Sequence, residues 1–358
     1  MSFRTKRILF ITPFYTILQF FLIKYLILLF YPINDITVAA IAILLGLNHF
    51  TPMIFESKKS RKITRFLTTI DGVWIWALIF LSIDLLVIYL IGMYINLTIG
   101  IKLILLSIIV VLGAYNYYRA HKIVVNEKTI KLDKLTQNIN IIQISDVHFG
   151  SIRHKQIIQQ LTRKLKELES SCDLIIISGD FADGSSVICE NDFLEFKKIN
   201  IPIIFTPGNH DFYPGIENVK SACEKADIII LDDENMEFKD LNIHGLTYSF
   251  ENRNQKPELD KTCIKSDKIN ILNYHVPYYW EEFSDLGFDI QLSGHTHGGQ
   301  FYPAIIFSEI IFKYNKGLFK NNNGKYLHVT TGVGSMDIPM RWGCDSEIVI
   351  LKLVKSRG

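Results

Sequence analysis

Cysteine is scarce in this sequence and net charge is small, and each shortage excludes a class of protein. The five cysteines follow neither a zinc-ligand nor a CxxC spacing, and an odd, unpatterned set does not form a disulfide framework: Cys172, Cys189, Cys223, Cys263 and Cys344. We expect all five to be small buried side chains in a reducing compartment. The formal net charge of +2 over 358 residues leaves no basic field, and therefore no signature of nucleic-acid binding.

Long apolar runs, in contrast, are abundant, and all of them lie before Arg119. Four runs approach or exceed the ~20 residues that cross a hydrocarbon core of about 30 Å. They are Ile8–Tyr31, Ile36–Phe55, Val73–Ile95 and Ile99–Tyr118. The first lacks a small-residue cleavage site, which argues against a removed signal peptide. We predict a four-helix transmembrane region over residues 1–118.

Basic residues beside these runs predict the orientation in the membrane. They precede the first run, fill the connection between the second and third, and follow the fourth: Arg4, Lys6, Arg7, Lys58, Lys59, Arg61, Lys62, Arg65, Arg119 and Lys122. The other two connections carry none. Because cytoplasmic loops are enriched in Lys and Arg, we expect these clusters and the C-terminal half on the cytoplasmic side of the cell (inner) membrane.

Two charged residues lie inside the runs, Lys24 in the first and Asp84 in the third. Counted from the cytoplasmic ends their depths nearly match, and lone charges in hydrocarbon are costly. One hypothesis is an intramembrane ion pair that locks the helices together. The alternative is that each side chain reaches separately for water or backbone.

From Asn140 onward, short apolar strands alternate with amphipathic helices, which is typical of an α/β domain. Residues 119–139 read as a linker with an edge strand, and 140–358 as the domain. The predicted strands are Ile141–Ser145, Leu174–Ser178, Ile203–Thr206, Ile228–Leu231, Ile269–Asn273, Ile290–Ser293, Leu327–Thr331 and Ile348–Leu353.

Metal-ligand residue types follow five of these strands. They are Asp146 and His148, Asp180, Asn209 with His210 and Asp211, His275, and His295 with His297. Carboxyl ends of neighbouring strands in an open sheet converge on one crevice, so these side chains are expected to meet. The mixture of carboxylate, amide and imidazole suits manganese, iron or zinc better than calcium or magnesium. Glycines before Asp180, Asn209 and His295 permit sharp turns at a crowded site.

The ordered motifs DxH, GD, GNHD, H and GHTH resemble the calcineurin-like metallophosphoesterase superfamily. The strings GHTHGGQ and HVTTGVGSMDIPMRW are similar to a bacterial and archaeal branch with membrane spans or a secretion signal. The resemblance implies two mixed β-sheets packed as a sandwich and flanked by helices. One departure is Cys344–Glu347, where that branch has a Pro-Glu pair. We expect this stretch to lie away from the ligands.

The resemblance also implies a binuclear centre of two divalent ions. One ion would take Asp146, His148, Asp180 and His297, and the other Asp180, Asn209, His275 and His295, with Asp180 bridging. His210, oriented by Asp211, would face the phosphate and serve the leaving oxygen. Two such ions clamp a phosphate and activate a bridging hydroxide that attacks phosphorus. The implied enzyme is a hydrolase of phosphoester bonds.

The motifs specify the bond type and leave the substrate and its binding residues open. Tethering to a membrane favours a phospholipid or a lipid-linked phosphoester. Phosphodiesterase or phosphatase activity on soluble nucleotides or small phosphoesters is the alternative. A metal-free scaffold and a transporter or sensor module are weaker readings, because every ligand position holds a competent residue and the short spans resemble an anchor.

Four loops should surround the crevice: Phe181–Ser186, Phe212–Gly215, Tyr278–Phe283 and Gln300–Asn315. The last contains Ile305, Ile306, Phe307, Ile310, Ile311 and Phe312 directly after the GHTH motif. One hypothesis is an interfacial element that dips into the bilayer. The alternative is that it packs as an ordinary helix or strand of the core.

Overall fold

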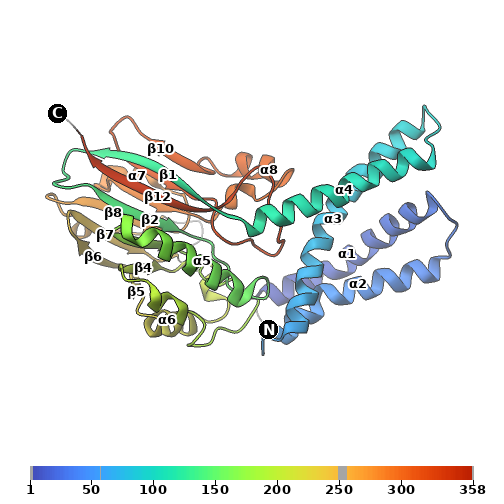
Figure 1. Ribbon diagram of the computed structural model, residues 1–358, viewed down its shortest axis with the longest axis horizontal. Coiled ribbons are helices and arrows are strands. Elements are labelled where there is room, and N and C mark those ends of the chain that lie inside the picture. Colours follow the sequence, from blue (N-terminus) through green and yellow to red (C-terminus); the bar gives the residue numbers. More distant parts are fainter. Residues whose placement is uncertain (1–2, 57, 249–255, 357–358) are drawn as a thin grey trace. The chain divides into compact units, whose positions relative to one another are not determined.

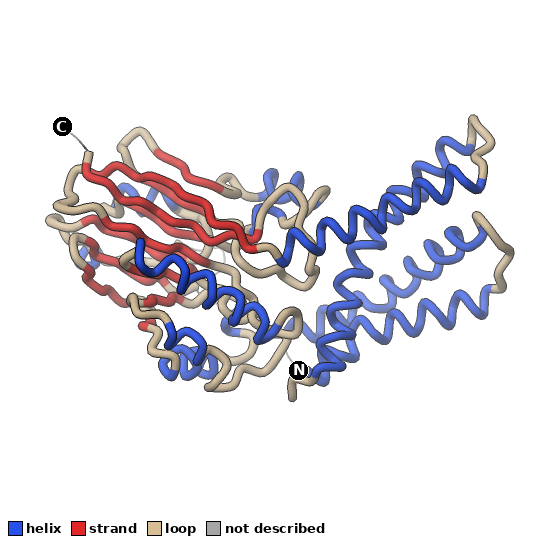
Figure 2. Tube along the Cα trace, viewed as in Figure 1, coloured by secondary structure: helices blue, strands red, loops and turns tan. Residues whose placement is uncertain are grey.

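The protein divides into two compact units in a computed structural model that describes residues 3–56, 58–248 and 256–356. One unit contains the chain up to Tyr118 together with two short segments, Ser185–Val187 and Asp337–Met340. The other contains the rest of the chain from Arg119 onward. Long helices make up the first unit, and the described strands belong to the second (Figure 2).

Four helices of the first unit are long and apolar enough to cross a membrane (Figure 1). They are α1 (Phe3–Leu28), α2 (Asp35–Glu56), α3 (Lys62–Gly92) and α4 (Ile99–His121). The third begins well before Val73, the predicted start of its apolar run. The apolar run ends where polar residues begin. The helix includes these polar residues, because other side chains of the same unit form hydrogen bonds with them. The hydroxyl of Thr64, for example, binds Glu56.

The hypothesised ion pair between Lys24 and Asp84 is wrong. The Lys24 ammonium lies 2.7 Å from the carboxylate of Asp35. Because α1 ends at Leu28, Lys24 stands about one turn from the end of its helix, and Asp35 is the first residue of α2. The short connection between the two helices therefore brings these charges together.

A buried polar pair that the sequence argument overlooked joins α2 to α3. His49 Nδ1 lies 2.9 Å from Asp71 Oδ2, and both side chains are nearly inaccessible. At the end of α2, the fully buried Glu56 accepts a hydrogen bond of 2.7 Å from the hydroxyl of Ser186, in one of the short segments of the same unit. Such pairs fix helix contacts in an otherwise apolar bundle, because leaving either member alone is costly.

Two mixed, six-stranded sheets form the second unit, which confirms the predicted α/β sandwich. The first has the order β1-β12-β2-β3-β4-β5, with β1 (Ile123–Leu132) at its edge, then β12 (Ser346–Lys355), β2 (Ile139–Ile144), β3 (Leu174–Ser178), β4 (Ile203–Thr206) and β5 (Ile229–Ile230). The second has the order β10-β11-β9-β8-β7-β6, made of β10 (Gly317–Lys320), β11 (Tyr326–Val329), β9 (Ile290–Ser293), β8 (Ile269–Tyr274), β7 (Leu241–Leu246) and β6 (Glu234–Phe238).

Each predicted strand has an observed counterpart, but β6, β7 and β10 were not predicted. The first two carry Asn, Glu and His between their apolar residues, so no continuous apolar run marks them. Within β7 the buried Asn242 donates to Asn270 of β8, and the sheet thus supplies a partner that sequence cannot show. β10 is a short strand at the edge of its sheet.

Alternation along the strands separates two cores. In β3, Leu174 and Ile176 pack between the sheets, while Ile175 and Ile177 pack under the helices on the outer face. That outer face is covered by α5 (His154–Leu168) and α6 (Ile216–Lys225). The second sheet carries α7 (Trp280–Leu286) on its own outer face. With both faces buried, the strands hold their carboxyl ends rigidly.

Candidate metal centre

The motif residues stand at strand ends of both sheets of the sandwich. Asp146, Asp180 and Asn209 follow β2, β3 and β4 of the first sheet. His275 and His295 follow β8 and β9 of the second sheet. The site therefore lies where the carboxyl ends of two packed sheets meet, and each sheet contributes one side of it.

One group of ligand atoms forms around Asp146, His148 and His297, whose nearest atoms all lie within 4.8 Å of one another. The two imidazole Nε2 atoms are 2.9 Å apart. His297 Nε2 is 3.3 Å from a carboxylate oxygen of Asp146. All three side chains are buried.

A second group contains Asp180, His275 and His295, and a third joins Asp180 to His148 and His210. One oxygen of Asp180 lies 3.1 Å from His275 Nε2 and 3.9 Å from His148 Nε2. Its other oxygen accepts a hydrogen bond of 2.7 Å from the backbone amide of His210. Asp180 thus stands between the groups, with one oxygen turned toward imidazoles of both.

The contacts of His275 fit a cation. Its Nδ1 lies 2.7 Å from the carbonyl oxygen of Ser178, so Nδ1 carries the proton and donates. The opposite nitrogen, Nε2, then presents a lone pair to the Asp180 carboxylate, and that buried atom has no hydrogen-bond partner. Two facing acceptors repel unless a cation, either a proton on Nε2 or a metal ion, lies between them. Fixing one imidazole nitrogen on a carbonyl is also how metal-bound histidines are commonly oriented.

The pKa shifts of the site's carboxylates and imidazoles also fit a site that attracts cations. Burial by itself lowers the pKa of His275, but the charge and hydrogen bond of Asp180 together with the charge of Asp146 raise the pKa to about 9. Burial raises the pKa of Asp146, yet the imidazoles of His297 and His148 hold that pKa well below its usual range. Burial together with the charge of His275 lowers the pKa of His295 to about 4. The carboxylates are therefore ionised, and they attract either protons or metal ions to the neighbouring imidazoles.

Backbone conformation is unusual at the ligand positions. Non-glycine residues seldom adopt positive φ, which costs on the order of 1–2 kcal/mol per residue. Five motif residues adopt it, with φ between 49° and 72°: Asp146, His148, Asp180, His295 and His297. The surrounding sheets impose these conformations, and strain concentrated at one place is typical of a functional site.

Glycines line the same turns, as the sequence predicts, because no side chain fits there. A Cβ on Gly294 would come within 2.2 Å of an Asp146 oxygen. A Cβ on Gly179 would come within 2.5 Å of His275 Nδ1. A Cβ on Gly208 would stand 2.5 Å from an Asp180 oxygen and 2.6 Å from its backbone nitrogen.

We expect Gly208→Ala to lower hydrolysis by on the order of 10²-fold, since a shift of about 1 Å in reacting groups has that effect. The added methyl displaces Asp180, so bound metal, measured by elemental analysis, should fall together with the rate. Gly92→Ala is the matched control, because a Cβ there meets nothing within 4 Å. An active, metal-replete Gly208→Ala protein would contradict the crowding argument.

The expected contact between Asp211 and the His210 ring is replaced by two others. His210 Nδ1 lies 3.0 Å from the carbonyl oxygen of Asp183. The buried Asp211 carboxylate accepts hydrogen bonds of 2.8 Å from the backbone amides of Ala182 and Gly208. Asp211 thus ties together the loops after β3 and β4, and burial with the charge of Asp180 raises its pKa to about 7.

Arg341 is a site residue that sequence reasoning missed. Its side chain is fully buried, and one guanidinium nitrogen donates to the carbonyl oxygens of Thr331 and Gly334 at 2.7 and 2.6 Å. The same nitrogen lies 3.5 Å from His297 Nδ1. The signal was present, because this arginine is the one Lys or Arg in the string HVTTGVGSMDIPMRW.

The departure at Cys344–Glu347 was expected away from the ligands, and this prediction is wrong. The Cys344 thiol lies 3.4 Å from the carbonyl oxygen of His297 and 3.1 Å from that of Gln300. The cysteine therefore supports the turn that carries a ligand. The expectation that all five cysteines are buried fails at one position, since Cys189 is exposed.

Polar side chains between the sheets fix the two halves of the site to each other. Gln143 of β2 donates a hydrogen bond of 3.1 Å to the carbonyl oxygen of Ser293 at the end of β9. Asn273 of β8 donates 3.1 Å to the carbonyl oxygen of Ile177 in β3. Both side chains are fully buried directly before ligand-bearing turns, so each hydrogen bond holds one sheet in register with the other.

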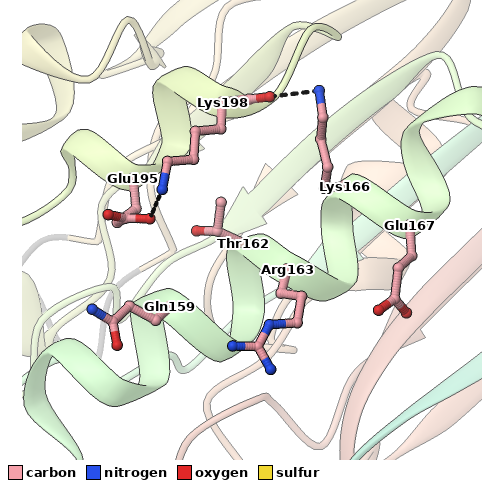
Figure 3. Close-up of a pocket in the computed structure, with 7 residues that line it drawn as sticks. All are labelled: Gln159, Thr162, Arg163, Lys166, Glu167, Glu195 and Lys198. Atoms are coloured by element: carbon pink, nitrogen blue, oxygen red, sulfur yellow. Dashed lines mark hydrogen bonds and ion pairs between the residues drawn. The ribbon is translucent and has the colours of Figure 1, made fainter.

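A separate pocket of about 560 Å³ lies between α5 and the 3₁₀ helix η2 (Leu194–Lys198) (Figure 3). Its lining residues are Gln159, Thr162, Arg163, Lys166, Glu167, Glu195 and Lys198, none of which belongs to the motifs. Lys198 is paired with Glu195. Lys166 donates to the carbonyl oxygen of Lys198 and is paired with Glu169. None of these lining residues belongs to the three groups of ligand atoms described above.

Several known proteins are similar to this chain. A metallophosphoesterase of Helicobacter pylori strain J99, described as uncharacterized, is 31% identical over 237 residues, which cover 64% of each chain. One from Aquifex aeolicus is 29% identical over 263 residues, covering 70% of this chain and 99% of that protein. A "transmembrane protein with metallophosphoesterase domain" of Danio rerio is 27% identical over 281 residues, covering 70% of this chain and 62% of that one.

The chain spans less than two thirds of the length of the Helicobacter relative. The matched region holds the catalytic-type residues, because residues 139–299 match the family model described as calcineurin-like phosphoesterase. This segment runs from β2 to the GHTH turn and includes every metal-ligand candidate described above. The chain belongs to the calcineurin-like phosphoesterase family.

Proposed function

We propose that this protein is a membrane-bound, metal-dependent phosphoester hydrolase with a binuclear centre. The observation that supports it most is the position of Asp180, whose carboxylate faces imidazoles from both sheets. One divalent ion would be held by Asp146, His148, Asp180 and His297. The other would be held by Asp180, Asn209, His275 and His295. When bound, the two ions supply an activated hydroxide and neutralise charge on the phosphate. Manganese, iron and zinc all suit this ligand set.

His210 is proposed as the group that serves the leaving oxygen. It is outside the proposed ligand set, and its ring is only partly buried, so a bound phosphoester can reach it. Nδ1 donates to the Asp183 carbonyl, so in the imidazolium form Nε2–H would be the proton donor to the leaving oxygen. Asp211 acts indirectly, as a positioning residue, by holding the loop on which His210 stands.

A lipid phosphoester is the proposed substrate class. The ring of Phe312 lies 5.7 Å from that of His295 and stacks on Tyr278, so an apolar wall borders a proposed ligand. Such a wall suits a substrate with acyl chains near its phosphate, whereas a nucleotide needs polar partners for its base and sugar. Soluble nucleotides or small phosphoesters remain the second candidate, because the metal groups themselves select only a phosphate.

We also propose that the catalytic unit faces the cytoplasm, because the basic residues between α2 and α3 and after α4 would lie on that side. A metal-free scaffold would not need competent ligands, and all of these positions carry them. The helices serve as an anchor in this proposal. A head group carried by the same membrane is then always at high local concentration.

Chelation should abolish hydrolysis and lower thermal stability. Ligands that bind only the folded state add about 2.7 kcal/mol at one hundred times their dissociation constant, so removal of the ions should lower Tm measurably. Activity and Tm of the purified full chain would be followed after EDTA treatment and after return of Mn²⁺, Fe²⁺ or Zn²⁺. Full activity in metal-free protein would refute the proposed centre.

The substrate proposal needs a direct comparison. Full-length protein loaded with Mn²⁺ would be given a membrane-lipid extract, nucleotides and small phosphodiesters, with His210→Ala as the blank for each. We expect release of phosphorylated head groups from the lipid fraction. Rapid cleavage of the soluble esters alone, with all lipids intact, would replace the first candidate by the second.

A further inference from the structure

The helix α8 (Ala304–Ile311) exposes large apolar side chains and buries a polar one, which is the reverse of an ordinary surface helix. Its inward side carries Ile305 and the polar Ser308, whose hydroxyl donates 2.6 Å to the side chain of Asn315. Its outward side carries four large apolar residues: Ile306, Phe307, Ile310 and Ile311. Ile310 and Ile311 are 77% and 68% exposed. We call these four residues the α8 face.

The alternative that this segment simply packs in the core does not hold for the α8 face. A soluble surface rarely groups large apolar side chains in one place without a partner. The one charged residue of the helix, Glu309, lies outside this face. At 100° per residue it stands roughly 130° from the centre of the four, on the flank of the helix.

The α8 face is attached to the candidate metal centre. The helix packs tightly on the turn His297–Gly299, where a Cβ on Gly299 would lie 2.5 Å from the Cα of Ile305. Phe312, which directly follows the helix, has its ring beside that of His295. The helix that carries the α8 face therefore packs on the turn of one proposed ligand, His297, and is followed by a residue in contact with another, His295.

Basic residues follow the helix. Lys313 and Lys320 are exposed and Lys316 is partly so. Lys313 is paired with Glu281, whereas Lys316 donates to the carbonyl oxygen of Gly343. An apolar helix face can insert at the boundary between head groups and acyl chains, and adjacent lysines attract anionic head groups.

The chain also keeps this unit close to a membrane. α4 ends at His121 and β1 begins at Ile123, so a single residue separates the last apolar helix from the first strand. The end of α4 is held within the catalytic unit, because the carbonyl oxygens of Ala120 and His121 accept hydrogen bonds from Arg153 and Gln160. This short described connection limits how far the unit can move from a bilayer that holds α4.

We propose that α8 docks on the lipid bilayer, with the α8 face inserted at the boundary between head groups and acyl chains. Docking presents the neighbouring turn, and with it the candidate metal centre, to head groups of the same leaflet. It is an interaction with the membrane and does not depend on the proposed hydrolysis, so the two can fail separately.

The test uses the full chain in proteoliposomes. Cys189→Ser removes the exposed thiol, and Ile310→Cys then carries an environment-sensitive fluorophore, with Phe307→Cys as a second probe site. Lys164→Cys, on the exposed polar side of α5, is the matched control. Quenching is measured with nitroxides on the lipid chains and with aqueous iodide, in the presence and absence of EDTA.

An interfacial helix inserts about 5–10 Å, so a nitroxide high on the acyl chain should quench the α8 probes more strongly than one near the chain end. Iodide should quench the Lys164 probe and spare both α8 probes, with or without metal. Strong iodide quenching at α8 would overturn the proposal. Protection from both quenchers would overturn it too, and would indicate that protein, either the chain's own helices or a second copy, covers the α8 face.

Discussion

Replacing Asp180 by Asn should remove hydrolysis almost completely, by on the order of 10³-fold or more. Metal ions contribute several kcal/mol to such a transition state, and each 1.4 kcal/mol is a factor of ten. Among the described residues, Asp180 is the one carboxylate that belongs to two of the three ligand groups, and it faces His148 and His275. An amide of nearly the same shape keeps the fold of the turn but loses the charge, so both ions should bind poorly.

The measurement combines elemental analysis, steady-state rates and thermal unfolding with and without Mn²⁺. The metal-dependent rise in Tm expected for the unmodified protein should vanish in Asp180→Asn. Asp285→Asn, an exposed position on α7, is the matched substitution and should change none of the three. If Asp180→Asn still bound two ions per chain and kept its rate, the assignment of a bridging role would be wrong.

Replacing His210 by Ala should give a different pattern, with slow chemistry and intact metal binding. Loss of a general acid costs about 10²–10⁴-fold in rate, and the deficit grows with the basicity of the leaving group. His210 is outside the proposed ligand set, so the metal content should stay near two ions per chain. The effect should therefore be large for an alkyl phosphoester and small for a nitrophenyl ester.

This dependence on the leaving group separates catalysis from a structural role. A His210 that merely supported the loop would slow all substrates equally, through lost metal or displaced ligands. His244→Gln is the control, because that histidine is buried in β7 and outside the proposed ligand set. Equal deficits for both esters, or loss of metal in His210→Ala, would remove His210 from its proposed role.

The two predictions rest on contacts that the sequence could not show. The spacing of DxH, GD, GNHD and GHTH indicates the residue types of the site. It does not show that His210 hydrogen-bonds the Asp183 carbonyl, or that Asp211 binds two backbone amides. Both facts depend on how the loops after β3 and β4 fold back on one another.

Long-range pairing explains the errors of the sequence argument. Lys24 and Asp84 were paired because their depths in the membrane nearly match. The short connection between α1 and α2 instead brings Asp35 within reach of the Lys24 side chain. The sequence gives no sign that His49 and Asp71 pair, because only the packing of α2 on α3 places them 2.9 Å apart. Cys344 looked remote from the ligands because sequence distance says nothing about the turn on which it packs.

The sequence by itself determined the local features: four apolar runs, the alternating strands, and a ligand-type residue after each of five strands. These depend on the period of apolar residues and on what each side chain can bind, which neighbours in the chain suffice to define. Tertiary structure alone decided that the ligands come from two packed sheets, that five motif residues take left-handed backbone, and that α8 turns its apolar side outward. Those outcomes arise because packing between distant segments supplies the energy that holds strained turns and closes the sandwich.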